Sequence, residues 1–335
     1  MIDQSPHFSI VMPVFNRERE IQRAIESCLA QTFMDFEIVV VDDGSTDHTA
    51  DAVAQYADPR VCLVRHDRNR GVCPARNTAV RASRGSWRIY LDSDHEMLPG
   101  CLARAVEFTG SAADVDRFGF LYRFDDGRIT PSPLPAEFTI GYREWLEWID
   151  TAEWTDALWF TRRACFDRCM LPESYALEFS YFLDFARLYR SRIVPEVLAF
   201  QHTDSPNRLS STAPAADPAL GRRKALDQAE DWQRVLSIHG AALKALAPAQ
   251  YRAVLRGASL SHTLAGQRWR GIAAGLACLR EGALSVAGVG TLVLALAGAR
   301  VALWTIRARA RRCRLAGPGR RTLIGPVLEA GPGGL

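Results

Sequence analysis

The segment FSIVMPVFNREREIQRAIESCLAQTFMDFEIVVVD, residues 8–42, decides the fold of this chain. It begins with an apolar, β-branched run at 8–14 and ends with another at 36–42, and both have the length and composition of buried strands. Between them, apolar residues recur at spacings of three and four: Ile21, Ala24, Ile25, Cys28 and Leu29. This spacing predicts an amphipathic helix over residues 17–31 and therefore a parallel β-α-β unit.

The alternation of strands and helices continues to residue 110. Apolar runs at 61–66 and 87–92 are further predicted strands, and residues 46–57 and 73–84 fit helices between them. This order predicts an α/β fold in which a mostly parallel sheet carries helices on both faces. Ligands of such sheets bind beyond the carboxyl ends of the strands, so functional residues are expected in the loops there. Later predicted elements are a helix at 98–109, a strand at 118–124, a helix at 178–191 and a strand at 193–200.

The two parts of the chain carry opposite charge. Residues 1–205 contain 22 Lys+Arg against 32 Asp+Glu, whereas residues 206–335 contain 19 against 6. The acidic first part argues against nucleic-acid binding, and the basic second part fits an anionic surface such as membrane lipid. With 335 residues, of which 48% are hydrophobic, the chain is long enough for about two domains, and wholesale disorder is excluded.

Cysteine spacing and the first residues bear on the compartment. The eight cysteines include no Cys-x-x-Cys pair and no zinc-finger spacing, so reduced structural thiols are predicted. The start, MIDQSPHFSIVMPVF, has no positive segment followed by an apolar one, which is the pattern of a signal peptide. We therefore expect the first part of the chain to lie in the cytoplasm.

The loop after the second predicted strand carries two adjacent carboxylates. It reads VDDGSTD over residues 41–47, and Asp42 and Asp43 could accept hydrogen bonds from a nucleobase imide or from ribose hydroxyls. The alternative is a capping cluster for the next helix, with Ser45 or Thr46 as the cap. The motif alone leaves both open.

The loop after the strand at 87–92 carries a second pair. In Leu91-Asp92-Ser93-Asp94, two carboxylates follow an apolar strand, and burying them is costly unless a cation neutralises them. Mg²⁺ or Mn²⁺ with oxygen ligands meets that need, and a solvated turn is the alternative. Between the two pairs, NRGVCPARN at 69–77 places Arg76 near the start of a helix, where a guanidinium suits a phosphate, a base carbonyl or a carboxylate.

Together these motifs resemble glycosyltransferase family 2, whose members bind nucleotide sugars with the GT-A fold. The matching stretches, in family order and spacing, are PVFN at 13–16, VDDGSTD at 41–47, NRGVCPARN at 69–77 and LDSDHEMLPG at 91–100. The resemblance implies a GT-A domain over 1–205, with a nucleotide-binding half at 8–110 and an acceptor half at 111–205. A linker at 206–221 and a basic helical region at 222–335 follow, outside the shared core.

The resemblance also implies roles for single residues. Asp42 and Asp43 resemble the pair that contacts the base, with Arg76 helping, and Asp92 and Asp94 resemble the DxD motif, with Asp92 toward the ribose and Asp94 on Mg²⁺ or Mn²⁺. His202 resembles a histidine that approaches the metal or diphosphate. The residues expected to hold the nucleotide sugar are Pro13, Phe15, Asn16, Asp42, Asp43, Asn69, Gly71, Arg76, Asp92 and Ser93, and those expected to hold the metal are Asp94, Asp92 and His202.

The general base is where this chain departs from the family pattern. Family members carry Glu-Asp at the start of a helix, whereas this chain reads Glu178-Phe179. We predict Glu178 as the base, with Asp156 as the second choice. An enzyme that moves a sugar with inversion from a nucleotide diphosphate, UDP foremost, to a hydroxyl acceptor in surface polysaccharide or glycolipid assembly is the leading prediction. The alternative is a nucleotide-sugar-binding module impaired by Phe179. A nicotinamide enzyme is disfavoured because no G-x-G-x-x-G follows the first strand.

The tail bears on the partners and the location. Residues 282–299 carry no charge, and seven arginines follow between 307 and 321 without an acid before Glu329. Arginines beside an apolar segment mark the cytoplasmic side of a membrane. The first part of the chain is also expected in the cytoplasm, so both flanks of this segment would lie on the same side. We therefore expect the segment to lie on the inner membrane without crossing it. The predicted partners are therefore a nucleotide-sugar donor, a saccharide or lipid-linked saccharide acceptor and, through 282–321, an anionic membrane surface. Packing of this helix within a soluble bundle is the alternative.

Overall fold

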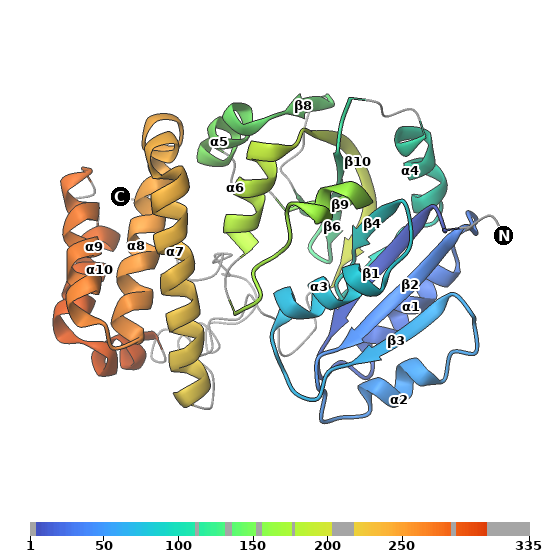
Figure 1. Cartoon of the computed structure of the whole chain (residues 1–335), viewed down its shortest axis with the longest axis horizontal. Helices are drawn as coiled ribbons and strands as arrows, with labels where there is room; N and C mark the ends of the chain where they lie inside the picture. The colour runs from blue at the N-terminus through green and yellow to red at the C-terminus, as the bar shows by residue number, and fades with distance from the viewer. Residues whose placement is uncertain are drawn as a thin grey trace. The chain divides into compact units, whose positions relative to one another are not determined.

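The computed structural model describes residues 5–110, 114–130, 136–151, 156–175, 178–202, 218–282 and 286–306. They divide into two compact units, residues 1–174 with 181–205, and residues 175–180 with 206–335. Figure 1 labels the elements of both units. The predicted domain limits stay predictions, because most of the linker at 206–221 lies outside the described residues.

The first unit is built on one sheet. Its strands are β1 (Phe8–Val14), β2 (Phe36–Asp42), β3 (Val61–Arg65), β4 (Trp87–Tyr90), β5 (His95–Met97), β6 (Arg117–Phe124), β7 (Ile129–Thr130), β8 (Phe138–Ile140), β9 (Leu158–Arg162) and β10 (Ser191–Gln201). The strand order is β3-β2-β1-β4-β9-β6-β10-β5, with β7 on β6 and β8 on β10.

The direction of the strands follows from their pairings. β3, β2, β1 and β4 are mutually parallel, β9 is antiparallel to both β4 and β6, and β10 is parallel to β6. Six strands therefore run in one direction, and β5, β7, β8 and β9 run against them. The predicted α/β class with a mostly parallel sheet is confirmed, and the short antiparallel strands are what the periodicity did not predict.

Helices cover both faces of the sheet, as predicted. The first unit contains α1 (Glu20–Leu29), α2 (Thr49–Ala54), α3 (Val72–Ala82), α4 (Cys101–Thr109), α5 (Tyr142–Thr151), a 3-10 turn at Arg163–Asp167 and most of α6 (Glu178–Leu188). Because side chains alternate along a strand, Ile10 packs with Ile21 of α1 on one face, and Val11 packs with Ala75 of α3 on the other. Every residue of β1 and β2 is buried, which explains why both strands are mostly apolar rather than alternating.

The second unit is helical and packs through small residues. Its helices are α7 (Pro218–Leu246), α8 (Pro248–Leu264), α9 (Arg268–Arg280) and α10 (Val286–Ala297). Gly257 of α8 lies against the Trp232 ring of α7, and Gly275 of α9 lies against Leu292 of α10, where a larger side chain would collide. Among the described residues, no helix combines the length and the apolarity needed to span a membrane.

Candidate functional site

The carboxyl ends of the parallel strands meet at one edge of the sheet, and the predicted motifs follow them there. β9 runs the other way, with Ile89 opposite Phe160 and Phe120 opposite Leu158. Its first residues therefore lie at the same edge as the ends of β4 and β6. This edge is the place where an open α/β sheet binds ligands.

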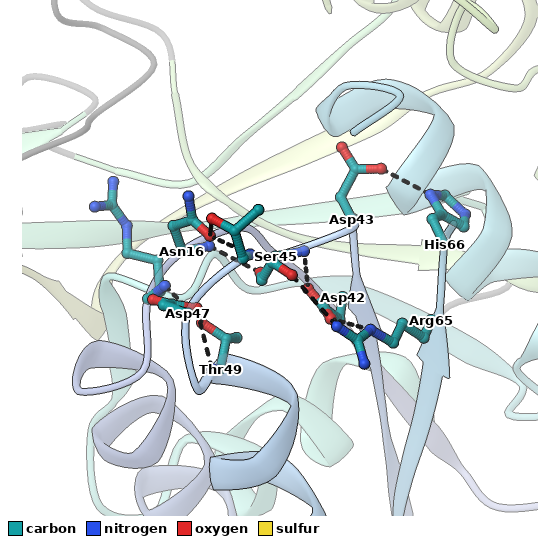
Figure 2. Close-up of polar contacts among 10 residues, drawn as sticks. Asn16, Asp42, Asp43, Ser45, Asp47, Thr49, Arg65 and His66 are labelled. Carbon is teal, nitrogen blue, oxygen red and sulfur yellow. Dashed lines mark hydrogen bonds and ion pairs between the residues drawn. The ribbon is translucent and has the colours of Figure 1, made fainter. Parts of the chain in front are cut away.

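The loops after β1 and β2 are joined by reciprocal hydrogen bonds (Figure 2). The Asn16 backbone N–H donates to Ser45 Oγ at 2.9 Å, and the Thr46 N–H donates back to the Asn16 side-chain oxygen at 2.8 Å. Asn16 has a φ of 52°, a left-handed conformation that asparagine tolerates better than most residues. The predicted site residue Asn16 therefore fixes the loop geometry, and its half-buried side chain is already engaged.

Asp42 is buried at the end of β2 and has partners of its own. Its carboxylate accepts the Ser45 N–H at 2.9 Å and lies 3.1 Å from the Arg65 guanidinium (Figure 2). These contacts match the capping alternative considered from the sequence. They hold the turn closed. Because Arg65 is more than half exposed, its guanidinium places a positive charge at the surface beside the site.

Asp43 is also buried and is still more fully engaged. Its oxygens accept the backbone N–H groups of Arg70 at 2.9 Å and Gly71 at 2.8 Å, and His66 Nδ1 lies at 2.7 Å. A carboxylate that accepts two backbone N–H groups anchors the loop that donates them. Asp43 thus ties the loop before α3 to the end of β2, and its predicted contact with a base stays a prediction.

Two glycines make this close approach possible. Gly44 has a φ of 74°, and a Cβ there would lie 2.5 Å from the Arg68 backbone. Gly71 has a φ of 103° and precedes the first residue of α3. Asn69 is half-buried in the same loop as Gly71, two residues before it. The predicted residues Asn69 and Gly71 are therefore brought to the Asp42–Asp43 side of the edge.

Pro13 and Phe15 differ in what they offer a ligand. Pro13 is buried inside β1 opposite Val41, so its role is to shape the strand end. Phe15 is 39% exposed just beyond that strand. An exposed aromatic ring at this edge is a suitable stacking partner for a nucleobase.

Arg76 and Asp92 form an ion pair between α3 and the end of β4. Arg76 Nη2 lies 2.6 Å from an Asp92 oxygen, and its guanidinium also lies over the Tyr90 ring at 5.2 Å. Burial alone would raise the pKa of Asp92, but the charge and hydrogen bond of Arg76, together with His95, lower it. Arg76 therefore stabilises the ionised form of Asp92, and its predicted contact with the base stays a prediction.

Asp94 lies beside a histidine that the sequence analysis did not single out. Ligand atoms of Asp92, Asp94 and His95 lie within 4.8 Å of one another, and His95 Nε2 is 3.8 Å from Asp94 Oδ1. His95 is 3% exposed, and its ring packs on Tyr122 with centroids 4.6 Å apart. Within the described part of the chain, neither ring nitrogen has a hydrogen-bond partner. Ser93, which is also buried, lies in the same turn.

Two carboxylates and an unpaired buried imidazole fit a divalent cation. The carboxylate oxygens suit Mg²⁺ or Mn²⁺, and an imidazole is a common transition-metal ligand. A buried ring with both nitrogens unpaired is costly, and a metal bond would satisfy one of them. The signal that could have found His95 is its position directly after the second aspartate of the motif.

His202, the histidine predicted to approach the metal, is engaged elsewhere. Its backbone N–H donates to the Asp94 carbonyl at 3.0 Å, but its ring lies against Glu96 at 2.5 Å and Asp125 at 3.6 Å. The side chain therefore lies beside the cluster without joining it in this structure. Arg23 completes this second polar group, 3.2 Å from Glu96.

The two candidate bases are placed differently. Asp156 is half-buried just before β9, at the edge described above. Burial raises the pKa of the Tyr122 phenol well above its usual value, and the charges of Asp156, Asp92 and Asp94 raise it further. Asp156 and the aspartate cluster thus both adjoin strands that meet at this edge. Glu178 is the first residue of α6 and is grouped with the second unit.

Comparison with known proteins identifies the class to which this domain belongs. Residues 9–165 match the family described as glycosyl transferase family 2. The fold, the order of the motifs and this match agree, so these residues form a glycosyltransferase family 2 domain, as the motifs predicted.

Curated relatives resemble parts of the chain. The succinoglycan biosynthesis protein ExoO of Rhizobium meliloti (strain 1021) is 46% identical over 111 residues, 33% of this chain and 32% of that protein. The glucosyltransferase WfgD of Escherichia coli, named as UDP-Glc:alpha-D-GlcNAc-diphosphoundecaprenol beta-1,3-glucosyltransferase, is 40% identical over 86 residues, 26% of this chain and 34% of that protein. The alignments thus span about a third of each relative.

Solved structures share the fold over most of the chain. Residues 1–349 of TarS from S. aureus, in complex with UDP-GlcNAc, align with a TM-score of 0.58 and 19% identity, covering 91% of this chain and 92% of that one. The mannosyltransferase PcManGT of Pyrobaculum calidifontis, in complex with GDP-Man and Mn²⁺, aligns with a TM-score of 0.50 and 20% identity, covering 92% and 87%. The predicted GT-A fold is confirmed.

Proposed function

We propose that this protein is a metal-dependent, inverting glycosyltransferase that moves a sugar from a nucleotide diphosphate to a hydroxyl acceptor. The observation that carries the proposal is the pairing, at one sheet edge of a family 2 domain, of the loops around Asn16 and Asp42 with the Asp92–Asp94–His95 cluster. The first group offers an exposed ring and shaped loops for a nucleoside. The second offers ligands for a cation that would bind a diphosphate.

Different residues would bind the cation, the ribose and the base. Asp92, Asp94 and His95 would hold Mg²⁺ or Mn²⁺, which when bound would stabilise the negative charge that develops on the departing diphosphate. Arg76 keeps Asp92 ionised and ready to bind a cation or a ribose hydroxyl. Phe15 lies where it could stack on the base.

We assign the general base to Asp156, ahead of Glu178. In an inverting displacement, the acceptor oxygen forms its bond to the anomeric carbon as the bond to the diphosphate breaks, and a base accepts the hydroxyl proton. Asp156 lies at the sheet edge that carries the aspartate cluster. Its charge, like those of Asp92 and Asp94, raises the pKa of the Tyr122 phenol. This reverses the order of preference that the sequence alone suggested.

The donor and acceptor classes follow from the relatives. TarS is solved with UDP-GlcNAc, and WfgD is named for transfer from UDP-Glc to a diphosphoundecaprenol-linked sugar. These names support a UDP-sugar donor and a lipid-linked saccharide acceptor in polysaccharide assembly. An acceptor of this kind would also place the protein at the cytoplasmic face of the inner membrane.

A nucleotide-sugar-binding module without transfer activity is the second candidate. Its support is Phe179, which stands where family members carry aspartate and whose ring centroid lies 5.9 Å from that of Trp232 in the second unit. An apolar residue packed against another ring cannot accept a proton. Such a protein would bind the nucleotide sugar but would not transfer the sugar.

The test is a panel of UDP- and GDP-sugars, each with and without Mn²⁺, read by thermal shift and by slow hydrolysis of the donor. A donor that binds only the native protein raises its melting temperature by mass action. Metal-dependent stabilisation with hydrolysis supports the enzyme, whereas stabilisation without hydrolysis or transfer to any acceptor supports the binding module. If no nucleotide sugar stabilises the protein, the proposed function is wrong.

A further inference from the structure

The end of the second unit exposes large apolar side chains that the helical bundle does not cover. Of the eleven large hydrophobic residues that are exposed in the described part of the chain, seven lie between residues 269 and 304. We call them the α9–α10 surface: Trp269, Leu276, Val289, Val293, Leu296, Val301 and Trp304. Trp269 is 79% exposed and Trp304 is 70% exposed. Exposed apolar groups gathered in this way mark an interaction site more often than chance exposure.

The exposed residues recur at helical spacing. Trp269, Ala273, Leu276 and Arg280 follow one another at intervals of four, three and four along one side of α9. The other side of α9 carries Gly271 and Gly275, which lie against Ser259 and Thr263 of α8. The apolar stripe of α9 therefore points away from α8.

The last helix presents a similar stripe. Val289, Val293 and Leu296 are exposed at intervals of four and three, while Ala295 is buried. α9 and α10 lie side by side, because Gly275 approaches Leu292 and the Arg268 guanidinium donates to the Leu296 carbonyl. The first turn of α9 thus lies beside the last turn of α10.

The predicted uncharged segment 282–299 is not one continuous helix. α10 ends at Ala297, Gly298 has a φ of 89°, and residues 299–306 form a further helical stretch that carries Val301 and Trp304. The exposed apolar residues are therefore spread over α9, α10 and the helical residues 299–306, with which the described part of the chain ends. Short segments with one apolar side suit a position along an interface.

The charge around this surface has one sign. Between residues 264 and 306 the only acid is Glu281, and it is paired with Lys244 at 2.7 Å. Four arginines of the same stretch are exposed: Arg268, Arg270, Arg280 and Arg300. A second copy of the chain would bring the same arginines face to face, and like charges disfavour that pairing. A partner with both an apolar layer and negative charge fits better.

We propose that the α9–α10 surface binds an anionic lipid bilayer, lying in the headgroup region without crossing it. Tryptophan is enriched at the boundary between headgroups and acyl chains, and arginines beside an apolar stripe are attracted to anionic lipid. This proposal goes beyond glycosyl transfer and does not require it. It extends the predicted membrane contact from 282–321 back to α9.

The test is flotation of the full chain with vesicles of phosphatidylcholine alone and of phosphatidylcholine mixed with phosphatidylglycerol. We expect binding to the anionic vesicles that weakens with salt. Replacing Trp269 and Trp304 together by serine should abolish flotation, whereas Ile238→Ser, which alters a residue of α7 that is 42% exposed, should not change it. Equal melting temperatures of all three proteins would show that folding is not the cause.

A charge variant separates attraction from apolar insertion. Arg270→Gln with Arg300→Gln should weaken binding to anionic vesicles about 25-fold, since each basic residue near such a surface contributes about a fivefold factor. Failure of the wild-type chain to float, or equal flotation of the tryptophan variant, overturns the proposal. A dimer in solution that the tryptophan variant loses would also overturn it, because a second copy would then be the occupant. Donor binding measured on the same variants should be unchanged, so the failure of one proposal is distinguishable from that of the other.

Discussion

The two aspartate pairs at the sheet edge have the same composition and opposite surroundings. Asp42 and Asp43 are buried and accept hydrogen bonds from backbone groups, Asp42 from its own loop and Asp43 from the loop before α3. Asp92 and Asp94 lie beside His95, a buried ring with no hydrogen-bond partner among the described residues. The first pair is held by backbone hydrogen bonds and by the Arg65 charge, whereas the second pair lies beside ring nitrogens that could bind a cation. The position of an aspartate after a strand does not by itself distinguish these roles.

The largest expected effect comes from the second pair. Asp94→Asn should lower the rate of transfer by about ten-thousandfold, because a metal ligand that stabilises transition-state charge contributes several kcal/mol. It should also remove Mn²⁺-dependent binding of the nucleoside diphosphate. The melting temperature of the variant, measured alongside, distinguishes loss of the metal from loss of the fold.

The control for this variant is Asp126→Asn, which alters an exposed acid paired with Arg128 in the turn after β6. It should transfer at the normal rate. If Asp94→Asn keeps its metal dependence, the assignment of the second pair as the metal site is wrong.

The next effect concerns the base. Asp156→Asn should lower transfer by about a thousandfold while donor affinity stays unchanged, because only the proton-accepting role is removed. Glu178→Gln is the matched variant and should transfer at close to the normal rate. The opposite result would return the role to Glu178, and full activity of both variants would mean that neither carboxylate is the base.

Replacing an aspartate of the first pair should lower the stability of the protein. Asp43→Ala should lower the free energy of unfolding by about 3 kcal/mol, because it leaves buried N–H groups of Arg70 and Gly71 without an acceptor. Denaturant unfolding measures this loss. Asp51→Asn, which alters a largely exposed acid of α2, serves as the control. Equal stability of Asp43→Ala and Asp94→Asn would break the distinction between the two pairs.

The sequence predicts the parallel half of the sheet well and the mixed half poorly. The runs at 8–14 and 36–42 coincide with β1 and β2, because strands buried on both faces are continuous apolar runs of limited length. β5 and β9 were not predicted, since each is short and exists through pairing with strands far away in the chain. The predicted helix at 98–109 begins instead at Cys101, after Gly100 takes a φ of 79°.

The sequence predicted the motifs of the site but not all of the contacts that their side chains make. Spacing identified Asp92 and Asp94, but the Arg76 contact to Asp92 and the Asp43 contacts to the loop before α3 depend on how three strand ends meet. His95 was missed for a physical reason. Its position after Asp94 is visible in the sequence, but its burial without a hydrogen-bond partner among the described residues exists only in the folded chain.

A smaller effect distinguishes the two histidines near the cluster. His95→Leu should weaken Mn²⁺ binding without a donor at least tenfold, which is about the effect of losing a group that supports a metal site. Electron paramagnetic resonance of free and bound Mn²⁺ measures it. His202→Leu should leave this affinity within about twofold, because its ring lies against Glu96 and Asp125. A larger loss in the His202 variant would restore the ligand that the sequence first suggested.

The smallest expected effect tests the nucleoside side of the comparison. Phe15→Ala should raise the Kd of the nucleoside diphosphate about tenfold, since stacking of a base on an aromatic ring contributes about 1–3 kcal/mol. The rate at saturating donor should stay near normal, because stacking on the base is made equally in the ground state and the transition state. Met34→Ala is the control, because Met34 is 60% exposed in the loop before β2 and is not part of the site. Calorimetry with the free nucleoside diphosphate gives the Kd, and a matched ribose diphosphate without the base should bind both variants equally. If Phe15→Ala weakens the binding of both ligands equally, the ring acts by supporting the two loops that Asn16 and Ser45 join. The Phe15 ring would then not recognise the base.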